Sequence, residues 1–297
     1  MHKILLNTAK FNFILTPRSP LLIKSGVDSP NPTLPDMYFV RTVTTKGETI
    51  FIPGSSLKGV FRSFAEKVLR TFGHGKACDP LDKKYSCAGI LKDLQDSKEI
   101  YRRSCRACKL FGNTKLKGRI TFTDFYPTGG VKTETRYGIA ISRLTHAVAK
   151  NSLFDMEVAV QGSFKGCMTL YNFEIWQLGI IALTIKAVNE GLVRIGYGKN
   201  RGLGEVDLSL TNLEIGYNGI HIPVPENALW GVGRLFSDEE RDGYGLSEND
   251  LISEIPYPDS KKTLGVIERR FYSSEKWEDI SHKVIAELSN KLTGEQQ

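Results

Sequence analysis

Four of the five cysteines lie close together in the sequence, and their spacing suits a metal ion. The last two form the motif Cys105-Arg-Ala-Cys108. A gap of two residues lets both thiolates reach one tetrahedral Zn²⁺, at bond lengths of about 2.3 Å. The sequence therefore predicts a structural zinc site with four thiolate ligands, namely Cys78, Cys87, Cys105 and Cys108.

Two other chemistries are open to these cysteines. Disulfides suit an oxidising compartment, and the sequence begins without a signal-peptide pattern, so we expect reduced thiols in the cytoplasm. A redox-active pair needs a thioredoxin-like βαβ context, which the neighbouring residues lack. His74 is a substitute ligand if one cysteine is out of reach. We interpret Cys167, which is alone in an alternating segment, as a small core residue.

A second chemical feature begins with the run Pro53-Gly54-Ser55-Ser56, which is typical of a helix start. Apolar residues then recur at helical spacing from Leu57 to Phe72, and Gly73 is placed to end the helix. We therefore predict an amphipathic helix here, with Ser55 or Ser56 as its N-cap.

Two cations, Lys58 and Arg62, lie four residues apart on this predicted helix. The amides and the positive dipole end of a helix N-terminus attract anions. The helix start and the two cations together predict a phosphate-binding surface. On this segment alone, an ordinary solvated basic face is the alternative.

A glycine-rich segment, Gly196-Tyr-Gly-Lys-Asn-Arg-Gly-Leu-Gly204, is a second candidate for binding phosphates. Its glycines, Gly198 among them, allow close approach of the backbone to a ligand, and Lys199 and Arg201 supply positive charge. It is no nucleotide P-loop, because it follows a predicted helix instead of a strand. A flexible connector is the alternative.

Residues 132–151 are polar and interleave aromatic side chains with cations, which predicts an exposed hairpin. Bases of single-stranded nucleic acids stack on rings and guanidinium planes while cations follow the phosphates. The candidate contacts are Arg136, Tyr137 and Arg143, and a solvated loop is the alternative.

The remaining elements follow from apolar periodicity, and they predict a mixed α/β chain. A proline-rich loop at residues 25–36 holds two carboxylates, Asp28 and Asp36, and leads through two short strands to the helix described above. Strands are predicted at 4–24 with a break near Pro17, at 38–43, at 49–52, at 119–126, at 153–173 with breaks at the glycines, and at 205–215; further helices are predicted at 175–195 and 275–292.

The chain has 297 residues and a net charge of +7, which suits a polyanionic partner. The charge is unevenly distributed, since residues 100–123 hold seven Lys or Arg and no acid, whereas residues 238–259 hold eight acids and one Arg. No apolar run reaches the roughly 18 residues that a membrane span needs. We therefore expect a protein that binds nucleic acid and not a membrane.

Several of these motifs, taken in order, resemble the RAMP superfamily and, more narrowly, the backbone subunits of type III CRISPR effector complexes. The resemblance covers roughly residues 5–215. It rests on Ile52-Pro-Gly-Ser-Ser-Leu-Lys-Gly59 with Arg62, Cys105-x-x-Cys-x-Leu-Phe-Gly112, Arg119-Ile-Thr-Phe-Thr-Asp124, Ile141-Ser-Arg143 and Gly196-x-Gly-x-x-Arg-Gly-Leu-Gly204.

The resemblance implies an α+β fold with a ferredoxin-like (RRM-like) palm. It places that domain at residues 1–217, with a zinc-stabilised insertion at about 74–110 and a β-hairpin thumb at about 130–155. Residues 218–297 form a C-terminal extension outside the resemblance. Subunits of this kind stack with other RAMP subunits along a guide CRISPR RNA.

The resemblance also implies roles for single residues. Ser55, Ser56, Lys58 and Arg62 would hold guide phosphates, and the glycine-rich segment would press against the same backbone. The thumb, with Arg143 and Phe154, would wedge into the duplex of guide and target RNA and flip a target nucleotide.

In cleaving members of the family, an Asp before the helix supports metal-dependent cutting of target RNA. Asp36-Met-Tyr-Phe-Val-Arg41 fits the family register, and Asp28 is the second choice. A carboxylate there would hold Mg²⁺ or another divalent ion while the 2′-hydroxyl of the target attacks.

The sequence leaves two other functions open and excludes a third. A non-cleaving scaffold would keep every RNA contact, with both Asp residues as turn formers. A guide-processing endoribonuclease needs a histidine, and His74 and His146 lie nearest the basic region. A serine hydrolase built on Ser55-x-x-Lys58 is excluded, because its companion motifs Ser-Asp-Asn and Lys-Thr-Gly are absent from the sequence.

Overall fold

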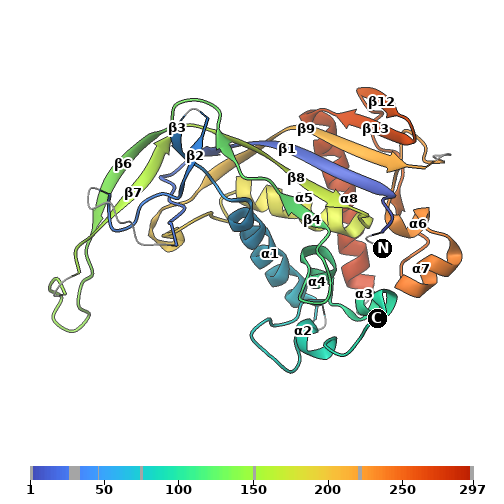
Figure 1. The fold of residues 1–297 in the computed structure, drawn as a ribbon, viewed down its shortest axis with the longest axis horizontal. Coiled ribbons are helices and arrows are strands. Elements are labelled where there is room, and N and C mark those ends of the chain that lie inside the picture. The colour runs from blue at the N-terminus through green and yellow to red at the C-terminus, as the bar shows by residue number, and fades with distance from the viewer. Residues whose placement is uncertain are drawn as a thin grey trace.

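A computed structural model describes residues 3–26, 34–45, 47–73, 76–149, 152–219 and 223–294. Its central sheet is antiparallel, in the order β12-β13-β9-β1-β8-β4, and β5 also pairs with β8 (Figure 1). The middle of the fold consists of β1 (Asn7–Pro17), α1 (Gly54–Thr71), β4 (Ile120–Phe122), β8 (Phe164–Tyr171), α5 (Ile175–Asn189) and β9 (Val206–Asn218). Along the chain these four strands come in the order β1, β4, β8 and β9, and helices α1 and α5 follow β1 and β8. In the sheet their order is β9-β1-β8-β4, which is the ferredoxin-like arrangement.

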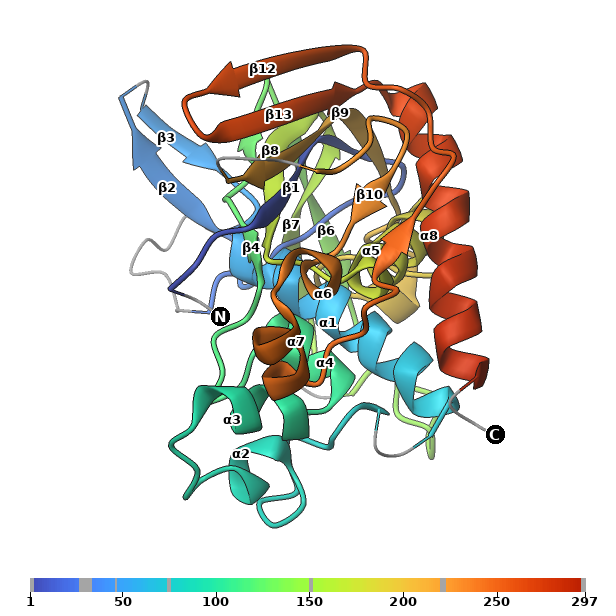
Figure 2. The same ribbon diagram turned by 90° about the vertical axis from the view of Figure 1, so that its right-hand side faces the viewer.

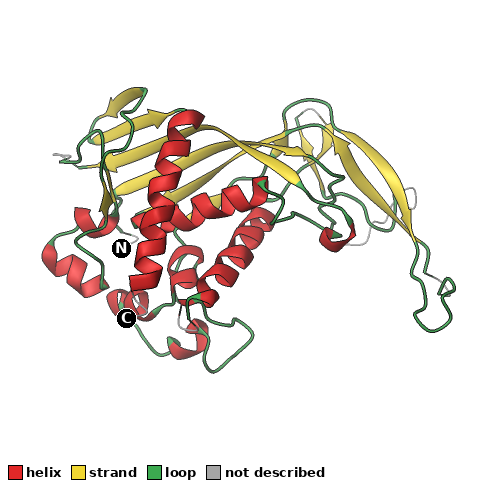
Figure 3. Ribbon diagram, turned by 180° about the vertical axis from the view of Figure 1, so that it is seen from behind, coloured by secondary structure: helices red, strands yellow, loops and turns green. Residues whose placement is uncertain are grey.

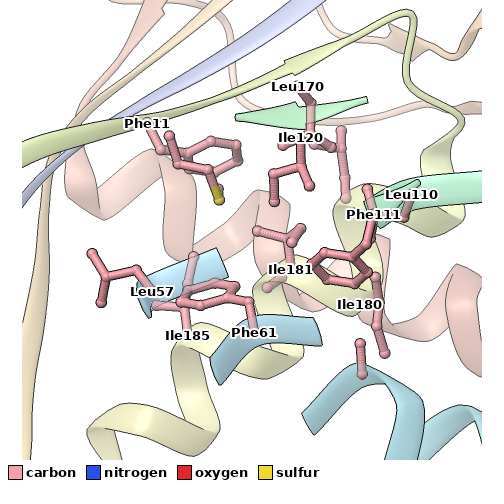
Figure 4. Packing of buried hydrophobic residues seen from close by; sticks show 14 of the residues in the cluster. Phe11, Leu57, Phe61, Leu110, Phe111, Ile120, Leu170, Ile180, Ile181 and Ile185 are labelled. Atoms are coloured by element: carbon pink, nitrogen blue, oxygen red, sulfur yellow. The ribbon is translucent and has the colours of Figure 1, made fainter. Parts of the chain in front are cut away.

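All the long helices lie on one face of this sheet (Figure 3). Alternate residues of β1 are buried against them, because side chains of a strand point to opposite faces in turn. Figure 4 shows Phe11 and Leu170 of the sheet above Phe61 of α1 and Ile181 of α5. Cys167 belongs to the opposite set on β8 and is only half-buried, so the prediction of a core cysteine is wrong.

Helix α5 is buried nearly all round, because it lies under the sheet between α1 and the last helix, α8 (Ser274–Gly294). Its Gly179 permits the close crossing, since a Cβ there would lie 2.4 Å from the carbonyl oxygen of Val284. The sequence predicted a helix that extends to residue 195, but α5 ends at Asn189. The chain turns at Gly191, which adopts a φ of +75° that few other residues tolerate.

Three insertions leave this core. The β2–β3 hairpin precedes α1, a lobe of short helices separates α1 from β4, and the β6–β7 hairpin projects far from the sheet (Figure 1). Their elements are β2 (Arg41–Thr44), β3 (Gly47–Ile50), α2 (Cys87–Ile90), α3 (Ser97–Arg103), α4 (Arg106–Phe111), β6 (Lys132–Gly138) and β7 (Phe154–Gln161). The short strand β5 (Tyr126–Pro127) belongs to the central sheet and leads into the β6–β7 hairpin.

The C-terminal residues extend the same sheet and helix layer (Figure 2). Strand β13 pairs with β9, and Trp277 of α8 meets the ring of Phe11 edge-on, with centroids 4.9 Å apart. The elements here are β10 (Leu229–Trp230), α6 (Val232–Leu235), α7 (Asp238–Tyr244), β11 (Leu251–Ile252), β12 (Ser260–Leu264), β13 (Ile267–Tyr272) and α8. No helix in the described part of the chain is both long and apolar enough to cross a membrane.

Helix α7 packs against α3 of the lobe. Lys98 forms an ion pair with Glu240, with 3.0 Å between Nζ and Oε1, and the rings of Tyr101 and Tyr244 meet edge-on with centroids 6.0 Å apart. The C-terminal region therefore supports the lobe from the side.

A buried polar network centred on Glu174 joins these parts. The Tyr101 hydroxyl donates to its carboxylate, Arg119 Nη1 lies 3.7 Å from it and Lys291 Nζ lies 4.0 Å from it. Glu174 also forms a capping box with Gln177 at the start of α5. Burial alone would raise the pKa of Glu174, but the charges of Arg119 and Lys291 outweigh burial and lower it.

We predict that Glu174→Gln lowers the free energy of unfolding by about 3 kcal/mol at pH 7, because it removes the negative charge that lies 3.7 Å from buried Arg119. The lowered pKa means that ionised Glu174 stabilises the fold above pH 4.5 and that this contribution is lost as the pH falls below that value. Urea denaturation at several pH values measures both effects. Equal losses for wild type and variant between pH 5 and pH 3 would contradict this assignment.

Candidate nucleic-acid interface and metal site

Helix α1 forms the floor of the candidate site. Leu57, Phe61 and Leu69 bury one face of it under the sheet, whereas Gly59 and Lys67 lie on the exposed face. The predicted helix is therefore confirmed, and its polar face is open to a ligand.

The N-terminus of α1 differs from the prediction. Pro53 is the N-cap residue, and the Oδ1 atom of Asp124 accepts a hydrogen bond of 2.8 Å from the amide of Gly54. The predicted cap by Ser55 or Ser56 is wrong, because a carboxylate from a distant segment takes that place. Asp124 also adds negative charge at the helix start, so positive side chains along the helix must supply most of the attraction for a phosphate.

The two predicted cations of α1 have different surroundings. Arg62 donates to Glu66 Oε1 at 2.7 Å and to the carbonyl of Gly112 at 3.1 Å, and its Nη2 lies 4.0 Å from Cys108 Sγ. It therefore fastens the helix to the lobe. Burial and the charge of Arg62 lower the pKa of Lys58, which is the behaviour of a cation that an anion would stabilise.

The glycine-rich loop borders α1 on one side. A hollow of about 410 Å³ between them is lined by Lys24, Ser56, Gly59 and Lys199. The loop approaches closely because Gly196 has no side chain, and a Cβ there would lie 2.3 Å from the carbonyl oxygen of Leu22. Sequence reasoning missed Lys24, which is far from the loop in the chain.

The hollow continues along α1 into a second one of about 310 Å³, lined by Ser63, Lys67, Arg194 and Lys199. Burial and the nearby charge of Lys67 lower the pKa of Lys199. This side of α1 is therefore a positively charged groove, and two of its cations, Lys67 and Arg194, carried no prediction.

Gly198 and Arg201 lie in the part of the glycine-rich loop that forms a short 3-10 turn. Gly198 adopts a left-handed conformation with φ of 69° at the start of a short 3-10 turn, Lys199–Arg201. The guanidinium of Arg201 lies 5.7 Å from the ring centre of Phe154, at the start of β7. The loop therefore touches the base of the projecting hairpin.

The projecting hairpin carries the other predicted RNA contacts. Arg136 is exposed on β6 and pairs with Glu134, with 2.6 Å between Nε and Oε1, while Arg143 is exposed in the loop beyond. This loop also exposes aliphatic side chains, including Ile141 and Leu144. The structure thus places these residues away from the groove along α1.

Asp36 lies beside the base of the hairpin. Its backbone amide donates to Asp155 Oδ1 at 2.7 Å, and Met37 forms a bridge with Met156 of β7. Asp36 is exposed, and Asp155 is a second carboxylate that sequence reasoning missed because 119 residues separate the two. Asp28 lies outside the described residues.

The four predicted cysteines meet in the lobe next to α1. Their sulfur atoms all lie within 4.8 Å of one another, and those of Cys78 and Cys108 are 3.7 Å apart. Four ligands at about 2.3 Å from one tetrahedral ion would be about 3.8 Å apart. Among the described residues no other group of three or more His, Cys, Asp or Glu has such an arrangement. The quartet can hold a metal ion such as zinc, and His74 lies outside the described residues.

The proximity of these thiols also favours a cation. Hydrogen bonds with Cys108 and Cys87 lower the pKa of Cys105 to about 2, whereas the hydrogen bond with Cys105 raises the pKa of Cys108. One thiolate is therefore stabilised at the expense of its neighbour. A divalent ion removes this competition, because it binds all four cysteines as thiolates. The amides of Cys78 and Cys105 also donate to sulfur, at 3.4 and 3.2 Å.

Comparison with known protein families gives one match. The model of the RAMP superfamily matches residues 14–207, which is well over half of the chain. The chain belongs to the RAMP superfamily. No curated protein sequence matches it. The family match ends near the start of β9, so the C-terminal region of the sheet lies beyond it.

Membership makes this RAMP protein a CRISPR-associated RNA-binding protein that assembles with other Cas proteins. The groove beside α1 agrees with that role, since its cations would follow the phosphates of a single strand. The resemblance seen in the sequence is thereby confirmed at the level of the superfamily.

We predict that the purified RAMP chain holds one metal ion per molecule and that Cys105→Ser abolishes this binding. Metal bound by four thiolates adds its binding free energy to folding, so chelation should also lower the melting temperature. Elemental analysis and a thermal melt measure these effects, with half-buried Cys167→Ser as the matched control. Wild-type protein that contains no metal after purification in zinc-supplemented medium would contradict the prediction.

Proposed function

We propose that this RAMP protein is a guide-RNA-binding backbone subunit of a type III CRISPR effector complex and that it cuts complementary target RNA. The guide would lie along α1 and the glycine-rich loop. The projecting hairpin would act as the thumb, and the loop that contains Asp36 would face the target strand.

The observation that carries this proposal is Gly59. It lies exposed in the middle of α1, and a Cβ built there meets no atom within 4 Å. Glycine at such a position costs a helix about 0.5–1 kcal/mol relative to alanine. No contact with another described residue requires a glycine there, and Gly59 lies in the groove with Lys199. A strand of RNA whose backbone passes directly over the helix explains it.

The structure of the β6–β7 hairpin supports its proposed role as the thumb. Phe154 at its base lies against Gly138, where a Cβ would be 2.4 Å from the ring, and Arg201 lies above the same ring. A rigid base of this kind suits a wedge that separates stacked bases. Arg136 and Arg143 would then contact the RNA backbone along the thumb.

Cleavage would depend on Asp36. Asp36 and Asp155 offer the oxygen ligands that Mg²⁺ prefers, and both are accessible to solvent. When bound, Mg²⁺ would stabilise the negative charge that develops on the phosphate. The protein would supply geometry, because a wedge that bends the target places its 2′-hydroxyl in line with the scissile bond.

Zinc would have a structural role in the Cys quartet. The lobe consists of short helices, and a metal would hold together its segments 78–87 and 105–108. Arg62 reaches both Cys108 and the carbonyl of Gly112. A zinc-loaded lobe would therefore keep the RNA-bearing face of α1 in place.

We predict that Asp36→Ala reduces cleavage of target RNA by about two orders of magnitude or more without weakening RNA binding. The assembled complex, labelled guide-matched RNA and Mg²⁺ measure both quantities. Exposed Asp93 in the lobe provides the matched control, as Asp93→Ala. Unchanged cutting by the Asp36 variant would contradict its role, and a wild-type complex that binds but never cuts would identify a scaffold.

We also predict that Gly59→Ala makes the free protein more stable, by about 0.5–1 kcal/mol, yet weakens its binding to single-stranded RNA. The added methyl group favours the helix but occupies the space that the RNA backbone would use. Urea denaturation measures the free energy of unfolding, and titration with single-stranded RNA measures the affinity. The control is Gly294→Ala at the end of α8, where a Cβ is also unobstructed. If both variants bind RNA like wild type, the path over α1 is wrong.

A further inference from the structure

A cleft lies between the β2–β3 hairpin and the segment 126–130, which leads from β5 toward the projecting hairpin. It consists of two adjoining hollows of about 510 and 290 Å³, and both are lined by Glu48, Thr49, Pro127 and Gly129. None of the described residues that line it belongs to α1 or to the glycine-rich loop. This hairpin cleft is therefore separate from the positively charged groove.

An exposed aromatic ring forms part of the wall of the larger hollow. Tyr126 is 42% exposed, and its ring stacks on that of Phe51 with centroids 5.8 Å apart and an interplanar angle of 17°. Phe51 thus supports the ring of Tyr126 without covering it. An aromatic ring that is held in this way offers a stacking surface to a planar ligand.

The facing wall consists of small residues. A Cβ on Gly129 or on Gly130 would meet no atom within 4 Å, so no contact with another described residue requires a glycine at either position. Both glycines line the smaller hollow, and Gly129 also lines the larger one. The absence of two side chains leaves room for a ligand to lie against the backbone here.

The charges of the cleft differ from those of the groove along α1. Among the described residues that line the larger hollow, the only charged one is Glu48, whose side chain is 61% exposed. In the smaller hollow Arg41 forms an ion pair with the buried carboxylate of Glu157 and lies 3.9 Å from Glu48. Two carboxylates and one cation disfavour a phosphate. A neutral ligand with hydrogen-bond donors suits the carboxylate of Glu48.

The cleft extends to the base of the projecting hairpin. Thr133 of β6 and Glu157 of β7 both line its smaller hollow. Asp155 precedes Glu157 by two residues, so the two side chains lie on the same face of β7. Since Asp155 accepts a hydrogen bond from the amide of Asp36, a ligand in the cleft would lie beside the strand that carries the candidate carboxylate pair.

We infer that the hairpin cleft binds one unpaired nucleobase of the target RNA, stacked on Tyr126, with Glu48 accepting a hydrogen bond from the edge of the base. This inference rests on the proposed function. A base is planar and uncharged, as the cleft requires, while its phosphate would remain outside in solvent. Adenine, cytosine and guanine carry an exocyclic amino group that can donate to a carboxylate, whereas uracil has none. The cleft should therefore favour these three bases over uracil.

An abasic nucleotide moved along the target RNA locates the base in the cleft. The assembled complex is titrated with guide-matched targets that each lack one base. At positions paired with the guide, wild type and Tyr126→Ala should lose affinity equally. At the position that faces the cleft, wild type should lose about fivefold or more and Tyr126→Ala should lose nothing further, because its stacking surface is already gone.

Two further variants serve as controls in the same titration. Tyr126→Phe keeps the ring and should behave like wild type at every position. Tyr85→Ala removes an exposed tyrosine of the lobe that does not line the cleft, so it should also behave like wild type. Equal affinity of all variants for targets with a single abasic nucleotide at the cleft position would show that Tyr126→Ala leaves the remaining RNA contacts intact.

The identity of the base at that position tests the role of Glu48. Wild type should bind cytosine there about fivefold more tightly than uracil, and Glu48→Gln should remove this preference because its amide also donates. If Tyr126→Ala has the same abasic profile as wild type at every position, the base site is overturned while the proposed function stands. If the wild-type complex binds guide-matched RNA no better than unmatched RNA, the proposed function itself fails.

Discussion

The buried carboxylate of Glu174 is the interaction on which the remaining structure depends. A charge this deeply buried is tolerated only when opposite charges and hydrogen bonds surround it. Its neighbours come from three parts of the chain: Tyr101 from the lobe, Arg119 from the segment before β4, and Lys291 from the last helix. Since Glu174 also begins α5, the network holds the lobe, the palm and the C-terminal region in one fixed arrangement.

Close backbone contacts, and not long side chains alone, shape the surface on both sides of α1. Gly196 lets the glycine-rich loop lie against Leu22, and the pair Gly112 and Gly118 closes the loop on the opposite side of α1. Both loops therefore lie in close contact with neighbouring backbone. The lysines between them have lowered pKa values because burial and like charges disfavour their ionised forms. A polyanion would relieve that repulsion, which is a source of affinity independent of RNA sequence.

Apolar periodicity predicted the principal helices, the central strands β1, β4 and β8 and the break between β7 and β8, because alternating or helical spacing of apolar residues follows the pattern of burial. It predicted none of the strands β10 to β13. The metal quartet was also predictable, since two of its ligands form a local motif. Other features depend on residues far apart in the chain. Asp124 caps α1 from 70 positions away, and Asp155 meets Asp36 across 119 positions.

The pairing of β13 with β9 has a consequence for aggregation. Without the C-terminal region, β9 would present a long free edge, and the apolar surface of α5 would be uncovered where α8 now crosses it. A free edge of that length is a template for pairing with other chains. The extension replaces it with β12, which is short, fully exposed and carries Lys261 and Lys262. Charged, solvated edges resist such pairing, so residues beyond the family match protect the β9 side of the sheet.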